Sequence, residues 1–335
     1  MSDNSNPIYS ARNVKKFFPV TGGILRRTIG QVRALDGVDL DIYRGETISV
    51  IGESGCGKTT LGRMLALLAK PTSGELNFDF GNGLEDVTNI SGAKEMAYRK
   101  RVQMIFQDPY TSFNPRQRIG AAIDEVLTVQ GIEDEKERSE RIESAFEMVN
   151  MRTEYLQRYP HEFSGGQRQR LSIARCLAGQ PEMIIADEIV SALDVSIQAQ
   201  IVNLLRRIQK DSGLSFMFIT HDVAVARYMG HRVAVMYLGS IVEILPSEAL
   251  PEKAEHPYTI ALLSAVPDMN ADSSIKRSTL QGEVPSPIDV PTGCAFSTRC
   301  PFVMEICRTE RPSLRNASSS QSGHKVACHL EVPPK

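Results

Sequence analysis

The sequence of 335 residues contains no tryptophan, few aromatic residues, and no apolar run long enough to cross a membrane. The lack of such a run excludes a transmembrane helix. The polar N-terminal segment also lacks the apolar core of a signal peptide. The net charge of −2 gives no bulk attraction to nucleic acid or anionic lipid. We therefore expect a cytosolic globular protein, with one large domain and an appendage or with two domains.

Cysteine is scarce except near the C-terminus, where Cys294, Cys300, Cys307 and Cys328 are separated by five, six and twenty residues. A disulfide framework is not expected in a reducing compartment, so clustered thiols suggest a metal or iron–sulfur centre. The spacing is not the C-x₂-C pair of zinc ribbons. An iron–sulfur cluster, a structural zinc ion with spare histidine ligands nearby, and free thiols are the alternatives.

The stretch 48–60 predicts a buried strand, a glycine turn and the start of a helix. Residues 52–59 fit G-x-x-x-x-G-K-[ST], the phosphate-binding loop of nucleotide hydrolases. Its N–H groups point into a concavity at the positive end of a helix, which suits a polyphosphate. We expect Lys58 to reach the β- and γ-phosphates and the Thr59 hydroxyl to coordinate Mg²⁺. The other nucleotide-binding residues of this stretch are Gly52, Glu53, Ser54, Gly55, Cys56, Gly57 and Thr60.

Three further predicted strands end in polar residues. One ends in Asp187 and Glu188: the first carboxylate is placed to hold Mg²⁺, and the second to orient and activate an attacking water. Another ends at His221, which is placed to contact a γ-phosphate. A third ends at Gln107, whose side chain can reach a metal or a water. Each reads as an ordinary turn residue when taken alone, but a phosphate loop opposite them favours a hydrolytic site.

A second helix start suited to an anion follows Ser164, which can cap the helix that begins at Gly165 and Gly166. A single chain that binds one triphosphate needs only one such anion-binding helix N-terminus. Upstream, Phe17 and Phe18 are equally compatible with stacking on a purine base and with packing in the core.

The remaining pattern predicts short strands over residues 8–50 and a hairpin at 81–83. It predicts helices over residues 119–159 and along one face of 197–208. A strand at 232–239 is expected to be the last of the main domain.

These segments, in this order, resemble the ATP-binding subunits of ABC transporters. The matched motifs are Walker A (Gly52–Thr59), the Q-loop (Gln107), the signature (Phe163–Gln167), Walker B and the catalytic glutamate (Asp187, Glu188), the D-loop (Ser191–Asp194) and the switch histidine (His221). The resemblance implies that ATP and Mg²⁺ are the cofactors, and that Gln107, Glu188 and His221 are catalytic. It also implies that Phe18 stacks on adenine, that Ser164, Gly165, Gly166, Gln167, Asp187 and Asp194 bind nucleotide, and that Gln107 and Asp187 contact the metal.

The implied fold is α/β, a P-loop ABC ATPase domain over residues 8–245 with a mixed sheet core, a β-subdomain and a helical subdomain at about 108–180. A small cysteine-containing C-terminal extension spans residues 246–335. Two ATPase subunits are implied to meet head to tail, each ATP lying between one Walker A and the other subunit's signature.

Residues 191–200 and 256–259 narrow the resemblance to the oligopeptide/dipeptide importer subfamily, although Ile189-Val190 stands where that subfamily usually has Pro-Thr. Some of its members carry a four-cysteine [4Fe–4S] site in the C-terminal tail. The resemblance implies an ATPase that powers peptide import, bound peripherally at the cytoplasmic face of the membrane.

The partners implied are a second ATPase subunit, typically a paralogue, two transmembrane permease subunits and an extracytoplasmic substrate-binding protein, with no nucleic acid. Another cargo (nickel, glutathione or oligosaccharide) and a soluble ABC ATPase outside transport are the alternatives.

Overall fold

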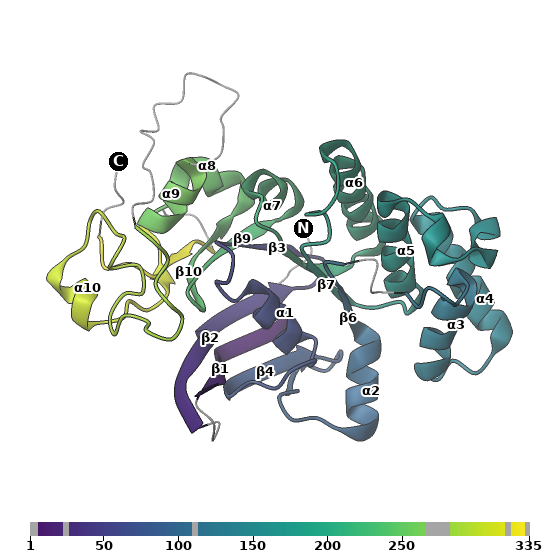
Figure 1. Cartoon of the computed structure of the whole chain (residues 1–335), viewed down its shortest axis with the longest axis horizontal. Coiled ribbons are helices and arrows are strands. Elements are labelled where there is room, and N and C mark those ends of the chain that lie inside the picture. Colours follow the sequence, from purple (N-terminus) through teal and green to yellow (C-terminus); the bar gives the residue numbers. More distant parts are fainter. Residues whose placement is uncertain (1–5, 23–26, 109–112, 265–281, 319–322, 332–335) are drawn as a thin grey trace.

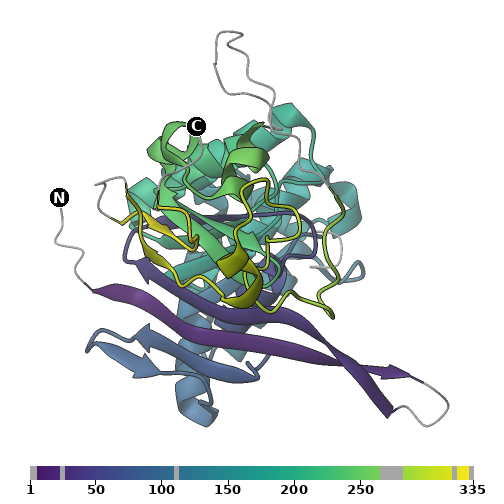
Figure 2. The same cartoon turned by 90° about the vertical axis from the view of Figure 1, so that its left-hand side faces the viewer.

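The computed structural model describes residues 6–22, 27–108, 113–264, 282–318 and 323–331 (Figure 1). Two β-sheets lie at its centre, with a group of helices on one side and the C-terminal region on the other (Figures 1 and 2). Within this part of the chain, no helix has the length and apolarity needed to span a membrane.

The smaller sheet is antiparallel, in the order β2-β1-β4-β5. Its strands are β1 (Pro7–Gly22), β2 (Arg27–Tyr43), β4 (Ser73–Asp79) and β5 (Leu84–Asp86). The hairpin predicted at residues 81–83 is confirmed, since β4 pairs with β5 across it. The short strands predicted before residue 50 are instead two long strands, because register shifts keep β1 and β2 paired along an irregular apolar pattern. This ribbon projects well beyond the body (Figure 2).

The larger sheet has the order β11-β12-β10-β9-β3-β8-β7-β6. Its strands are β3 (Thr47–Ile51), β6 (Val102–Ile105), β7 (Met183–Asp187), β8 (Ser215–Ile219), β9 (Arg232–Tyr237), β10 (Ser240–Pro246), β11 (Arg315–Asn316) and β12 (Lys325–Val326). Strands β6, β7, β8, β3 and β9 run parallel, and the others are antiparallel. Strands β3, β7, β8 and β9 are buried on both faces, which explains their nearly continuous apolar runs.

The strand predicted at 232–239 is not the last of this sheet. After it the chain turns back into β10, and Glu243 of β10 pairs with Val326 of β12. The C-terminal region therefore adds two strands to the main sheet. Sequence periodicity gives no signal for β11 and β12, because each has only two residues.

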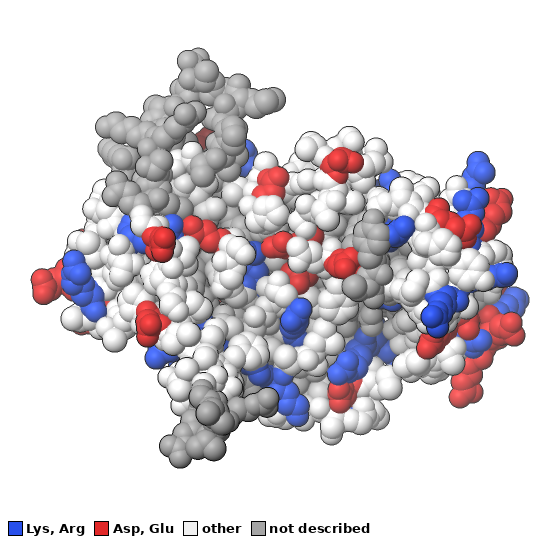
Figure 3. Space-filling view, viewed as in Figure 1, with Lys and Arg blue, Asp and Glu red and all other residues white. Residues whose placement is uncertain are grey.

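The helices are α1 (Lys58–Leu65), α2 (Gly92–Arg101), α3 (Ile119–Val129), α4 (Glu135–Met148), α5 (Gly165–Ala178), α6 (Val195–Ser212), α7 (Val223–Met229), α8 (Leu250–Lys253), α9 (Pro257–Ser264) and α10 (Glu305–Thr309). Short 3₁₀ turns lie at η1 (Thr153–Gln157), η2 (Pro160–Glu162) and η3 (Ser247–Ala249). Charges of both signs gather at the end of the molecule where α3 and α4 lie (Figure 3), as the alternating charges of α4 predict for a solvated surface.

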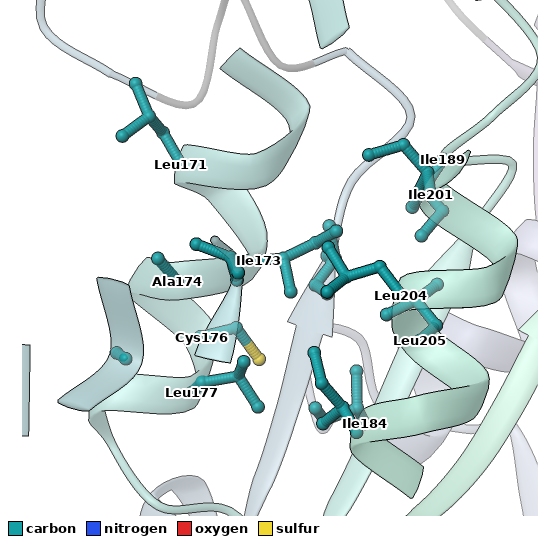
Figure 4. Close-up of a cluster of buried hydrophobic side chains, with 14 of the residues drawn as sticks. Leu171, Ile173, Ala174, Cys176, Leu177, Ile184, Ile189, Ile201, Leu204 and Leu205 are labelled. Carbon is teal, nitrogen blue, oxygen red and sulfur yellow. The ribbon is translucent and has the colours of Figure 1, made fainter. Parts of the chain in front are cut away.

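Three buried apolar clusters hold these layers together. In the first, side chains of α5 and α6 converge on Ile184 of β7 (Figure 4). The second lies between the smaller sheet, α1 and the larger sheet. The third joins β9 and β10 to the C-terminal region through Tyr237, Tyr258 and Phe296. The first cluster sets the position of the helical part, and the third sets that of the C-terminal region.

Candidate active site

The register of the parallel strands brings the predicted site residues to one edge of the larger sheet. Val50 on β3 pairs with Ile219 on β8, and Ile219 pairs in turn with Asp187 on β7. The carboxyl ends of these strands therefore lie side by side. The phosphate loop, the paired acids and the histidine all follow these ends, so they share this edge.

The loop 52–57 connects β3 to α1 and depends on its glycines. Gly52, Gly55 and Gly57 all have positive φ angles, of 154°, 78° and 108°. At two of them a side chain would also collide with a neighbouring carbonyl, that of Met236 at Gly52 and that of Ala34 at Gly57. Only glycine meets both demands, so the local sequence encodes the tight curl of this loop.

Lys58 is buried inside this curl. Its Nζ donates to the carbonyl oxygens of Gly52 at 2.8 Å and Glu53 at 3.0 Å. The ammonium group is thus held by two carbonyl oxygens of the loop. Cys56 lies beneath it, with its Sγ 3.8 Å from the Lys58 Nζ, and burial raises the pKa of the Cys56 thiol.

The hydroxyl of Thr59, at the start of α1, donates to Oδ1 of Asp187 at 2.9 Å. Burial raises the pKa of Asp187, and the neighbouring negative charge of Glu188 adds to that effect. A buried carboxylate beside a hydroxyl oxygen favours a cation at this point, because a cation would stabilise its charged form.

The three residues predicted to be catalytic lie together, with Glu188 between Gln107 and His221. The Glu188 Oε2 accepts a hydrogen bond from Nε2 of Gln107 at 3.2 Å and lies 3.7 Å from Nδ1 of His221. The Glu188 backbone has a positive φ of 48°, which is uncommon for a non-glycine residue, and its N–H donates to the Ile219 carbonyl. The next residues, Ile189 and Val190, are buried in the first apolar cluster, where Figure 4 labels Ile189. Their burial anchors the turn that carries Glu188.

Several of these groups, but neither Asp187 nor His221, line one cavity of about 300 Å³. Its lining comprises Val32, Ala34, Ser54, Gly55, Gly57, Lys58, Thr59, Thr60, Gln107, Glu188 and Pro287. Phe18 does not line it but is paired in register with Val32, which places both side chains on the same face of the ribbon. Phe18 is 43% exposed, so the alternative that it packs in the core is wrong, while Phe17 is half-buried.

The predicted second anion site lies at the N-terminus of α5, which is closed by a capping box. The Ser164 hydroxyl accepts a hydrogen bond from the Gln167 N–H, and the Gln167 side chain accepts one from the Ser164 N–H. A side chain at Gly166 would lie 2.6 Å from Ile197, so α5 and α6 approach closely there. Asp194 is exposed at the N-terminus of α6. None of these residues lines the cavity around Lys58.

Comparison with known proteins places this geometry in a family. A family model described as "ABC transporter" matches residues 35–191, and one described as "Oligopeptide/dipeptide transporter, C-terminal region" matches residues 242–307. The oligopeptide transport ATP-binding protein AppF of Bacillus subtilis is 46% identical over 330 residues, with 98% of each chain covered. The chain belongs to the ABC transporter ATPase family. The dipeptide transport ATP-binding protein DppF of Haemophilus influenzae is 45% identical over 328 residues, again with 98% of each chain covered.

A solved ABC ATPase has the same fold. The ATP-binding cassette MJ0796, solved as a dimer in a post-hydrolysis state with ADP and Pi, superposes with a TM-score of 0.61 at 27% identity, covering 71% of this chain and 98% of that chain. The predicted P-loop ABC ATPase fold with mixed sheets is thereby confirmed.

The iron–sulfur site predicted at Cys294, Cys300, Cys307 and Cys328 is wrong. All four are described, yet no group of three or more His, Cys, Asp or Glu side chains within the described ranges is placed to hold a metal ion. Burial raises the pKa of Cys294 to about 11 and also raises those of Cys300 and Cys328, which favours protonated thiols. Cys294 and Cys300 pack instead against the third apolar cluster.

The same finding removes the structural zinc alternative. The spare histidines are engaged elsewhere: His324 lies 2.9 Å from Glu243, and His329 lies 3.0 Å from the Glu310 carbonyl. The spacing along the sequence shows that the cysteines gather, but it does not show whether the folded chain places them to hold a metal ion.

Sequence reasoning missed three residues of this ABC ATPase that touch the site from the C-terminal region. Arg299 pairs with the Glu53 carboxylate, the Tyr258 hydroxyl contacts the Glu53 N–H, and Pro287 lines the cavity. The segment 256–259, which contains Tyr258, is visible in the sequence only as a subfamily signature. Arg299 and Pro287 carry no local signal, because their contacts join residues far apart in the chain.

Proposed function

We propose that this chain binds ATP with Mg²⁺ and hydrolyses it, and that hydrolysis powers the import of di- or oligopeptides through a membrane transporter. The observation that carries the proposal is that Lys58, Thr59 and Glu188 line one cavity at a sheet edge, with Asp187 hydrogen-bonded to Thr59 beside it. Lys58 would contact the β- and γ-phosphates, and the loop N–H groups would hold the remaining phosphate oxygens.

Thr59, Asp187 and Gln107 would hold the Mg²⁺ ion, which neutralises charge that develops on the phosphates. The carboxylate of Glu188 is the proposed base that orients and activates the attacking water. Gln107 and His221 lie within reach of that carboxylate and fix its orientation. Phe18, exposed beside Val32, would stack on the adenine.

The residues at the start of α5 support a head-to-tail pair of ATPase subunits. Ser164, Gly165, Gly166 and Gln167 form an anion-suited helix start that does not line this chain's own cavity. We propose that they contact the ATP of a second ATPase subunit, with Asp194 at the same interface. Closure on ATP would move the attached membrane partners, and hydrolysis would release them.

The proposal that the cargo is a peptide is supported by the relatives, which are named as oligopeptide and dipeptide transport ATP-binding proteins. We propose that the chain binds two permease subunits and a paralogous ATPase at the cytoplasmic face of the membrane, in a system with an extracytoplasmic binding protein. We propose that residues 8–245 form the ATPase domain, with a helical part at about 108–180, and that residues 246–335 form the C-terminal region.

The substitution Glu188→Gln tests the hydrolytic role. We expect kcat for ATP to fall by about 100-fold or more, because the general base is lost while the phosphate contacts remain. Phosphate release measures turnover, and titration with an ATP analogue checks that binding is intact. The matched control is Glu143→Gln, the same change at an exposed residue of α4. Turnover of Glu188→Gln close to that of the control would refute the assignment.

Purification from native membranes in mild detergent tests the transport role. We expect two permease chains, a second ATPase and bound peptide to accompany this chain. Recovery with ribosomes or DNA, and without membrane chains, would leave the ATPase assignment in place and exclude the transporter.

A further inference from the structure

Glu53, the second residue of the phosphate loop, is held by the C-terminal region through its side chain. Arg299 donates from Nη1 to Oε2 of Glu53 at 2.7 Å and from Nη2 to Oε1 at 3.1 Å. This is a two-bond fork of the kind that fixes geometry as well as charge. The Arg299 side chain is only 4% exposed, so water does little to screen the pair.

The backbone of Glu53 is held from the same direction. Its N–H donates to the hydroxyl of Tyr258 at 2.9 Å, while its carbonyl accepts from Nζ of Lys58. The Tyr258 ring is fully buried against Tyr237, with ring centroids 4.7 Å apart, and against Phe296. The Glu53 carbonyl also accepts from the Cys56 N–H. Every polar group of Glu53 is therefore engaged, and two of its four partners, Arg299 and Tyr258, belong to the C-terminal region.

A second contact between the C-terminal region and the site involves Pro287. Pro287 lines the cavity itself, and its carbonyl accepts a hydrogen bond from the Arg33 N–H at 2.9 Å. Arg33 follows Val32, which also lines the cavity. The C-terminal region thus touches the site at the loop and at the ribbon.

The loop needs such support because its glycine residues allow its backbone many conformations. Its three glycines at positive φ give the unsupported chain many alternative shapes. Ordering these shapes on binding would cost affinity, whereas contacts that order them beforehand remove that cost. Both the side chain and the N–H of Glu53 bind residues that lie outside the loop and outside α1.

We propose that Arg299 and Tyr258 are positioning residues for the phosphate loop, through which the C-terminal region sets the affinity of this ATPase for nucleotide. The inference rests on the proposed ATP-binding function and adds a role for the C-terminal region within the same site. Neither residue touches the reacting atoms. Their effect passes through Glu53 to the loop carbonyls that hold Lys58.

The test compares Arg299→Gln, Tyr258→Phe and wild type as full-length chains. Arg299→Gln removes the charged fork, and Tyr258→Phe removes one hydroxyl while keeping the buried ring. We expect the Kd for a nonhydrolysable ATP analogue with Mg²⁺ to rise about 10- to 100-fold in the first and about 3- to 10-fold in the second. We expect KM for ATP to rise in parallel, with kcat within about twofold of wild type. Arg299→Lys, which keeps the charge but not the fork, should lie between Arg299→Gln and wild type.

The matched control is Arg311→Gln. Arg311 also joins the C-terminal region to the ATPase, through Asp36 at 2.8 Å, but it does not contact the loop. Its Kd should stay within about twofold of wild type, since no loop contact is lost. Circular dichroism and thermal unfolding identify a variant that fails to fold. If Arg299→Gln does so, the isosteric Tyr258→Phe decides the outcome.

Two results separate failure of this inference from failure of the ATPase assignment. If wild type binds the analogue, Lys58→Ala does not, and Tyr258→Phe binds as tightly as wild type, the positioning role is refuted and the ATPase assignment stands. If wild type does not bind the analogue and Lys58→Ala changes nothing, the ATPase assignment itself is refuted.

Discussion

His256 is a fully buried histidine of the C-terminal region, immediately before α9. Its Nδ1 accepts a hydrogen bond from the Tyr258 N–H, and its ring packs against Phe296. Burial lowers its pKa to about 3. The side chain is therefore neutral in the folded protein at any pH at which the protein is expected to work.

This burial makes stability depend on pH. Between about pH 6.5 and pH 3 the unfolded chain takes up a proton at His256 and the folded chain does not, so the free energy of unfolding falls as the pH falls. The contribution is at most about 1.4 kcal/mol per pH unit. We expect His256→Gln to flatten the decline between pH 6 and pH 4, as measured by urea unfolding at each pH. Identical slopes for the two proteins would contradict the lowered pKa.

At the scale of one element, helix α6 shows how local sequence fixes both a packing face and an end. Ile201, Leu204, Leu205 and Ile208 are buried on one face, as the predicted period requires (Figure 4 shows the first three). The helix stops at Gly213, which has a φ of 67° and donates to the Gln209 carbonyl. This left-handed end lets the chain turn directly into β8, which leads to His221.

The end of α6 gives a prediction about stability alone. Because a side chain at Gly213 would meet no atom within 4 Å, Gly213→Ala should cost only backbone strain, about 1–2 kcal/mol of unfolding free energy. Gly213→Asn is the matched control and should cost less, since asparagine tolerates this conformation. Chemical denaturation measures both. Equal stability of Gly213→Ala and wild type would show that the helix can end in another way.

At the scale of the whole molecule, a buried polar network joins the main sheet to the C-terminal region. Glu243 of β10 is fully buried and accepts hydrogen bonds from the N–H groups of Glu255 and His256, at 2.7 and 3.2 Å. His324, also buried, lies 2.9 Å from the same carboxylate. A buried carboxylate is tolerated only when it is satisfied in this way, so the network fixes where the C-terminal region attaches.

Glu243→Gln tests this attachment. The amide supplies one acceptor oxygen for three donors, so we expect the free energy of unfolding to fall by about 1–3 kcal/mol. Glu248→Gln, the same change at an exposed residue two positions after β10, should stay within about 0.5 kcal/mol of wild type. Urea midpoints of the two variants provide the comparison. A cost at Glu243 no larger than at Glu248 would show that the network is not needed for attachment.

The sequence alone determined the family, the α/β fold and the grouping of the hydrolytic residues. In each motif, one short run of residues predicts a strand and also supplies the reactive side chains at its end, such as the apolar run that ends in Asp187 and Glu188. Parallel strands bring such ends to one edge whatever the details of packing. For that reason Lys58, Thr59, Asp187, Gln107, Glu188 and His221 could be grouped without a structure.

Only the tertiary structure decided how the C-terminal region is used. It adds β12 and β11 to the main sheet, packs Cys294 and Cys300 against an apolar cluster, and pairs Arg299 with Glu53. Glu53 and Arg299 are 246 positions apart in the chain. Periodicity and spacing report local backbone geometry, whereas these outcomes depend on which buried surfaces meet and which way each side chain then points.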